Sequence, residues 1–395
     1  MNDKTSALKE VGMVLKENLR NYAMYIALAV IFILFYILSN GAFLTARNIT
    51  NLINQTGYVA VMAVGMTLIL ILRQIDLSIG YLAGLCGACA AVLLKNGYSV
   101  AVVIPIVLAI GMFAGFVQGT IIGWLGVPAF VTTLACQFIF RGLQILTTEA
   151  TGTIPIGNDT FSRISNGFVP SLFRVEGRHG SALLIGALVI LIVIIAQIRE
   201  RRDLKRYNFY TAPLPLFIFS LLFFSALIGS FTYILSGFNG ISWTIVVVVV
   251  IALVYNFILN RTRFGRYVYG AGGNREAATL AGIDVKRMIV ITFSSMGLMA
   301  AMGGILFTSR LQSATPTAGA GFELDAIAAC FIGGVSTTGG VGRVINSIIG
   351  AFVIMSLTNG MNLIGIGISY QYIIKGGIFI IAVAFDVFSQ GNQTV

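Results

Sequence analysis

The segment YAMYIALAVIFILFYIL, from Tyr22 to Leu38, is a run of apolar and aromatic residues without a single charge. A run of this length, wound as a helix, is long enough to cross the hydrocarbon core of a bilayer, which is about 30 Å thick. It ends without the small-residue pattern of a signal-peptide cleavage site. We therefore interpret it as a first membrane span, preceded by a charged amphipathic segment over 1–21 on the cytoplasmic side.

The composition extends this interpretation to the whole chain. Of 395 residues, 57% are hydrophobic and only 10% are charged, and the mean hydropathy is +0.93. A typical soluble domain carries about 25% charged residues, so this composition excludes a soluble enzyme, a disordered chain and a secreted disulfide scaffold. The 45 glycines fit a bundle in which transmembrane helices approach closely.

Twelve apolar runs of about 20 residues predict an all-α, polytopic membrane helix bundle of about 12 transmembrane helices, forming one domain over 1–395. The weakest run, 323–337, is short and Gly-rich and opens with Glu323 and Asp325, so a broken or re-entrant element is an alternative there. The runs lie near 22–39, 56–73, 77–94, 100–124, 128–147, 181–198, 213–236, 241–260, 288–309, 323–337, 344–363 and 369–388.

The distribution of basic residues predicts the orientation. The net charge is +11, and most Lys and Arg residues fall in the segments that are cytoplasmic when the N-terminus is placed inside. This bias favours a multi-pass membrane protein with two cytoplasmic termini. We therefore interpret the net positive charge as a signal for membrane orientation and not as a nucleic-acid-binding surface. The polar segment 149–180 is then an external loop, and the basic segment 261–287 is cytoplasmic.

The sequence lacks the signature of an ATPase. A phosphate-binding loop requires a Gly-Lys pair, and none occurs in the chain. The Gly-rich run GGVSTTGGVG, from Gly333 to Gly342, lacks the lysine, so we interpret it as close helix packing or a flexible turn. The single histidine, His179, does not build a catalytic set, and we predict no catalytic, cofactor or metal-binding residues in this chain.

The cytoplasmic segment GRYVYGAGGNREAATLAGIDVKR, Gly265–Arg287, predicts a short helix between two spans. Asn274 suits its N-cap, Glu276 its positively polarised first turn, and Gly282 its end. Two functions remain open from these residues alone: docking of a small apolar surface on a cytoplasmic partner, or a solvated loop that only sets orientation. The residues assigned to this candidate coupling site are Gly272, Gly273, Asn274, Glu276, Ala277, Ala278, Leu280 and Gly282.

Within that segment, EAATLAGI resembles the EAA-type loop of ABC importer permeases, and the chain is similar to the ribose/xylose/galactose class of bacterial sugar permeases. The resemblance extends to GAFLTARNITNLINQT (41–56), GMTLILILRQIDLSIG (65–80), GVPAFVTTLACQFIFRGL (126–143), ELDAIAACFIGGVSTTGGVGR (323–343) and NGMNLIGIGISYQYIIKGGIFIIAVAFD (359–386). It implies a monosaccharide permease subunit. The implied partners are an ATPase subunit that binds ATP and Mg, an extracytoplasmic sugar-binding protein and a second permease copy.

One region departs from the compact members of that class. The sequence offers an additional pair of spans over 181–236, joined by the basic run RERRDLKR. Such a pair resembles the longer xylose-type or multiple-sugar permeases. An even insertion leaves the orientation of all later spans unchanged.

Polar residues within the spans are candidates for a translocation path or gate. A buried charge near mid-bilayer costs about 2.5–3.5 kcal/mol, so it needs a partner, water or a span end. Arg73 and Asp76 are three residues apart and are predicted to pair if the helix continues, and Lys375 is predicted to snorkel. For each candidate a structural role within the bundle is the alternative. The candidates are Arg73, Asp76, Gln118, Thr132, Thr133, Gln137, Arg141, Glu323, Asp325, Asn359 and Asn362.

Two other functions remain open at this stage. An ion-gradient-driven secondary transporter would use Asp76, Glu323 and Asp325 as inward-facing ion sites. An ABC permease for another solute, such as branched-chain amino acids, would share the helical architecture. The sugar class is favoured over both only by similarity.

Overall fold

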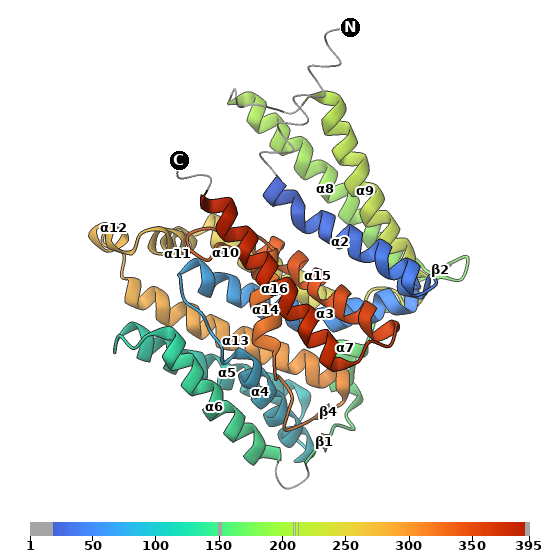
Figure 1. Cartoon of the computed structure of the whole chain (residues 1–395). Coiled ribbons are helices and arrows are strands. Elements are labelled where there is room, and N and C mark those ends of the chain that lie inside the picture. The colour runs from blue at the N-terminus through green and yellow to red at the C-terminus, as the bar shows by residue number, and fades with distance from the viewer. Residues whose placement is uncertain (1–18, 149–151, 208, 210, 212, 392–395) are drawn as a thin grey trace.

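The computed structural model describes residues 19–148, 152–207, 209, 211 and 213–391. Within this part of the chain the protein is a bundle of α-helices (Figure 1), which confirms the predicted fold class. The main helices are α2 (Leu19–Leu38), α3 (Ala46–Ile71), α4 (Ile79–Lys95), α5 (Val100–Gly123), α6 (Ala129–Thr148), α8 (Gly180–Arg206), α9 (Leu214–Ser236), α10 (Trp243–Arg261), α13 (Val285–Leu311), α14 (Phe322–Ile332), α15 (Val344–Leu363) and α16 (Ile368–Gly391).

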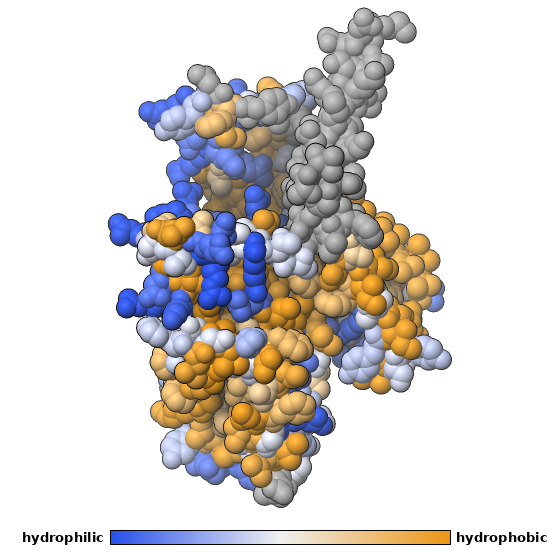
Figure 2. All heavy atoms as spheres, turned by 60° about the vertical axis from the view of Figure 1, so that its left-hand side comes forward, coloured by the Kyte–Doolittle hydropathy of each residue, from blue (hydrophilic) through white to orange (hydrophobic). Residues whose placement is uncertain are grey.

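Each predicted span coincides with one of these helices. Eight of them, within the described residues, are long and apolar enough to cross a membrane, and α2, α4 and α16 contribute shorter apolar stretches. Figure 2 shows hydrophobic residues covering the lower part of one face, with hydrophilic residues gathered above them. The multi-pass membrane bundle is confirmed, whereas the total of twelve spans and the location of both termini stay predictions.

Helix α14 is the exception among the predicted spans. It has 11 residues, which at 1.5 Å per residue gives a length of about 16 Å, roughly half of a bilayer core. It begins after Gly321 and ends at Gly333, and both Gly321 and Gly334 adopt positive φ. The irregular segment 333–343 then leads to α15. A continuous span over 323–337 is therefore wrong because residues 333–337 are not helical, and the alternative of a broken element agrees with the structure.

The first and last thirds of the bundle repeat one arrangement. Helices α3–α6 and α13–α16 each comprise a long helix, an irregular segment, a shorter helix and two further helices. Non-glycine residues with positive φ, Arg73 and Gln312, follow the long helices α3 and α13 in both series. Helix α5 packs on α13, as α15 packs on α3. Gly65 of α3 lies against Met296 of α13, whereas Met62, earlier in α3, lies against Gly303, later in α13. The two long helices are therefore antiparallel, and the two series form an inverted repeat.

The core lies around α13, which packs on α3, α4 and α5 (Figure 1). Gly111, Gly115, Gly119 and Gly123 recur every four residues on α5, and each lies against the α13 backbone or its Cβ atoms. Residues four apart share one helix face, so α5 presents a strip without side chains to α13. Close backbone approach of this kind is how helices associate in lipid, where burial of apolar surface supplies no net drive.

The segments predicted outside this core have distinct structures. Over 149–180, of which 149–151 lie outside the described residues, the chain forms β1 (Ile154–Pro155), α7 (Asp159–Asn166), β2 (Arg174–Val175) and β3 (Arg178–His179). Strand β1 pairs antiparallel with β4 (Ser313–Ala314), and β2 with β3. In the 181–236 pair, Gly186 of α8 contacts Thr232 of α9. Most of the predicted 1–21 segment lies outside the described residues.

Candidate coupling site and pathway residues

The segment between α10 and α13 folds into two short helices, α11 (Arg263–Gly273) and α12 (Arg275–Leu280). The Asn274 side-chain oxygen accepts a hydrogen bond from the Ala277 N–H at 3.0 Å, which satisfies one of the free donors at the start of α12. Glu276 lies in the first turn, and Gly282 follows the helix with φ +82°. The predicted cap, first turn and end of this helix are confirmed.

The exposed side of α12 differs in one respect from the prediction. The Leu280 side chain is 90% exposed, and Glu276 and Ala277 are exposed beside it, whereas Ala278 is only 6% exposed. Ala278 packs toward the bundle, because two residues along a helix correspond to a rotation of about 200° and Leu280 therefore points to the other side. The prediction that Ala278 belongs to the outward apolar surface is wrong, and Leu280 is its main apolar group.

Gly272 and Gly273 form the end of α11. Gly272 is buried against the Ile71 carbonyl at the end of α3. The Arg73 guanidinium donates a hydrogen bond to the Gly273 carbonyl at 2.7 Å. The predicted Arg73–Asp76 ion pair is wrong, because α3 ends at Ile71 and Arg73 turns away with φ +59°.

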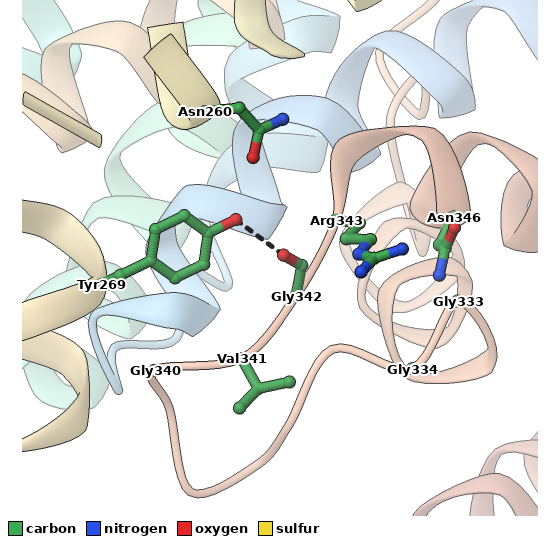
Figure 3. A pocket seen from close by; sticks show the side chains of 9 residues that line it. All are labelled: Asn260, Tyr269, Gly333, Gly334, Gly340, Val341, Gly342, Arg343 and Asn346. Atoms are coloured by element: carbon green, nitrogen blue, oxygen red, sulfur yellow. Dashed lines mark hydrogen bonds between the residues drawn. The ribbon is translucent and has the colours of Figure 1, made fainter. Parts of the chain in front are cut away.

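The Gly-rich segment 333–342 lies against the same region. The Gly340 N–H donates to the Ile71 carbonyl at 2.9 Å, and the Tyr269 hydroxyl donates to the Gly342 carbonyl at 2.7 Å (Figure 3). Burial raises the pKa of Tyr269, an effect partly opposed by the charge of Arg343, so the hydroxyl keeps its proton. Beside this contact lies a cavity of about 400 Å³ whose lining includes Asn260, Arg343 and Asn346.

The candidate pathway residues near the start of α4 form one buried network. Asp76 is 1% exposed, and its carboxylate accepts hydrogen bonds from the Ser78 N–H at 2.8 Å and the Ser78 hydroxyl at 2.7 Å. The Gln118 amide of α5 donates to the Ser78 hydroxyl at 2.6 Å. Thr133 of α6 donates to the Ile75 carbonyl at 3.4 Å. The network therefore ties the irregular segment before α4 to α5 and α6.

A second group surrounds the start of α14. The Lys375 ammonium of α16 lies 2.9 Å from one Asp325 oxygen and 3.1 Å from the other. Lys375 therefore pairs with Asp325, and the prediction that it snorkels to a span end is wrong. Glu323 is 7% exposed and faces Gly80, and one of its carboxyl oxygens has no hydrogen-bond partner among the described residues.

The remaining candidates lie apart from these two groups. Arg141 is exposed on α6, with its guanidinium 5.7 Å from the centre of the Tyr81 ring, and Gln137 is half-buried one turn earlier. Thr132 donates back to the Pro128 carbonyl at 3.2 Å. Asn359 accepts from the Asn48 amide at 2.9 Å, and Asn362 from the Gln371 amide at 2.8 Å. The structure thus does not bring all the candidates to one site.

Sequence reasoning missed three residues of the α11–α12 region: Tyr269, Gly339 and Gly340. Gly339 and Gly340 adopt φ of +78° and +71° and pack on Arg73 and Gly273 respectively. The Gly-rich composition signalled a special backbone, but the partners of that backbone lie far away in the sequence, Gly273 67 positions before Gly340 and Arg73 266 positions before Gly339. No local pattern reports a contact of that separation.

Known proteins resemble this chain over nearly its whole length. The family described as "Branched-chain amino acid transport system / permease component" matches residues 48–383. The xylose transport system permease protein XylH of Haemophilus influenzae is 36% identical over 370 residues, which cover 93% of this chain and 96% of the relative. XylH of Escherichia coli K12 is 34% identical, with 93% and 92% covered.

The ribose import permease protein RbsC of Escherichia coli K12 is 34% identical over 344 residues, 87% of each chain. No solved structure matches the chain. Both the family match and these identities cover far more than half of the sequence. The chain therefore belongs to this family of transport-system permease components, and within it to the xylose-type monosaccharide permeases.

Proposed function

We propose that the chain is the membrane-embedded permease of an ATP-driven importer for a monosaccharide, xylose or a related pentose or hexose. The observation that carries the proposal is the identity of 36% to a xylose permease over 93% of this chain. The multi-pass apolar bundle and the exposed short helix α12 support it. As a permease subunit of the cytoplasmic membrane, the chain does not itself hydrolyse ATP.

In this proposal a separate ATPase subunit, which binds ATP and Mg, docks on α12. An extracytoplasmic sugar-binding protein delivers the sugar on the opposite side, and a second copy of the chain completes the pathway. Leu280 supports the docking step, because a leucine that is 90% exposed on a six-residue helix has no packing role in the single chain. An apolar anchor that fills a partner's pocket is typical of an interface hot spot.

For the pathway, we propose that Gln137 and Arg141 line or gate the route, while the more buried candidates hold its walls. Arg141 is exposed on an apolar helix, and a charge there is stable only beside water or another protein chain. Asp76, Gln118, Thr132, Thr133 and Asn359 make hydrogen bonds inside the bundle. They are better suited to fixing helix positions than to meeting sugar.

Replacing Leu280 with aspartate is expected to weaken binding of the ATPase subunit at least 10-fold, because a charge would replace the apolar anchor; each tenfold is about 1.4 kcal/mol. The measurement is co-purification of the two subunits and sugar-stimulated ATPase activity. Leu172→Asp is the control, since Leu172 is 85% exposed in the 149–180 segment on the other side. Unchanged ATPase binding by Leu280→Asp would contradict the docking assignment.

The substrate class is tested by reconstitution. Vesicles holding the complete complex are expected to accumulate xylose or a related sugar only when ATP is present on the ATPase side. Uptake of leucine in place of sugars would instead identify the chain as a permease for branched-chain amino acids. Uptake that survives removal of ATP but stops with an uncoupler would identify an ion-gradient-driven transporter instead.

A further inference from the structure

Three segments that are far apart in the sequence meet at the end of α3. They are the last residues of α3 with Arg73, the end of α11 at Gly272 and Gly273, and the Gly-rich segment 333–342. Two hydrogen bonds connect them: Arg73 to the Gly273 carbonyl at 2.7 Å, and Gly340 to the Ile71 carbonyl at 2.9 Å. We call this meeting point the α3 joint.

The α3 joint is packed backbone to backbone. A Cβ atom on Gly272 would collide with the Ile71 carbonyl oxygen, and one on Gly339 would collide with the Arg73 side chain. A backbone carbonyl at a helix end cannot change rotamer to avoid a neighbouring atom, so α11 cannot move toward the end of α3 without displacing it. A displacement of α11 is therefore passed directly to the end of α3.

Arg73 adds a second connection at some conformational cost. Its φ of +59° lies in the left-handed region, which costs a non-glycine residue about 1 kcal/mol or more. That conformation directs the guanidinium to the Gly273 carbonyl, and Gly273 directly precedes the Asn274 cap of α12. Arg73 thus holds the α11–α12 corner against the end of α3.

The joint also reaches the second half of the inverted repeat. Its Gly-rich segment connects α14 to α15, and Tyr269 of α11 holds this segment through the Gly342 carbonyl. The cavity of about 400 Å³ beside Gly333, Gly334 and Gly342 gives the segment open space on one side (Figure 3). A shift of α11 can therefore move the ends of α14 and α15 as well as the end of α3.

We propose that Arg73 and Gly272 are positioning residues that pass the motion of the ATPase subunit from α12 to both halves of the inverted repeat. The inference rests on the proposed docking of that subunit on α12. Neither residue touches sugar or nucleotide in this proposal. Without these two contacts ATP hydrolysis continues while sugar transport fails, because the movement of the ATPase subunit no longer reaches the transmembrane helices.

The test uses the complete complex in vesicles and measures sugar imported per ATP hydrolysed. Gly272→Ala and Arg73→Gly are each expected to lower this ratio at least 10-fold while the ATPase subunit stays bound. Arg73→Gly is the more discriminating change, because glycine relieves the left-handed backbone and removes only the side chain. Arg73→Lys retains one donor and is expected to restore part of the ratio.

Gly270→Ala is the matched control, since Gly270 lies on the same helix and a Cβ there meets only ordinary contact with Ile283. A normal ratio of sugar to ATP in both Gly272→Ala and Arg73→Gly would overturn the inference. Should Gly272→Ala fail to fold, Arg73→Gly alone decides it. Failure of the wild-type chain to bind any ATPase subunit would instead refute the proposed function, so the two failures are distinguishable.

Discussion

A Gly115→Leu variant is expected to yield almost no folded protein. Gly115 lies in the middle of the α5 glycine strip, and a Cβ atom there would collide with the Phe293 carbonyl of α13. The obstacle is backbone inside a helix, which cannot rotate away. Relief requires α5 and α13 to separate, and this opens the most extensive helix contact in the bundle.

Adding side-chain atoms to a packed core typically costs about 1–3 kcal/mol. We expect the Gly115→Leu cost to exceed that range, because leucine adds four carbon atoms where not even one fits. Such a loss is comparable to the whole stability of a typical domain, about 5–15 kcal/mol. The measurement is the yield of monodisperse protein in detergent and its thermal unfolding, with Gly115→Ala expected to fall between the variant and wild type.

Gly142→Leu supplies the control, since no atom lies within 4 Å of a Cβ at Gly142 and the residue is exposed on α6. It adds the same side chain to another apolar helix and is expected to unfold near the wild-type temperature. A Gly115→Leu protein as stable as Gly142→Leu would show that α5 and α13 are not held by backbone contact.

The helices were predictable because each needs only local information. An apolar run such as 100–124 predicts a membrane span without any knowledge of the helices that pack around it. The structure places α5 at Val100–Gly123. The segment 323–337 failed for the opposite reason. Its helix ends where Gly333 packs on the α15 backbone and Gly334 turns with positive φ, and a hydropathy average does not register such an end.

In the candidate site, too, the features that depend on neighbouring residues were predictable, and those that depend on distant residues were not. The Asn274 cap and the Gly282 end were predicted because caps depend on residues within one turn. The burial of Ala278 depends on how α12 packs on the bundle, and the turn of Arg73 toward Gly273 joins residues 200 positions apart in the sequence. The α5 glycine strip was visible as a four-residue repeat, but its partner α13 was not.

The Asp325–Lys375 pair shows how far pairing lies beyond sequence reasoning. The two residues are separated by 50 positions, and either one alone reads as a charge in need of a partner. Their side chains are 14% and 21% exposed, so water reaches neither freely. The pair connects the first turn of α14 to α16. It thereby fixes the position of α14, which is too short to span the bundle by itself.

Lys375→Ala is expected to destabilise the protein by about 3–5 kcal/mol, because it leaves the Asp325 carboxylate buried without a counter-charge. Thermal unfolding in detergent measures the loss, and Lys95→Ala, which removes an exposed lysine at the end of α4, is expected to change little. The double variant Asp325→Asn with Lys375→Ala is expected to recover most of the stability, since no buried charge then remains. An equal loss of stability in the single and double variants would mean that Lys375 stabilises the protein through packing of its aliphatic chain. Both variants lack that chain, whereas only the single variant leaves a buried carboxylate without a counter-charge.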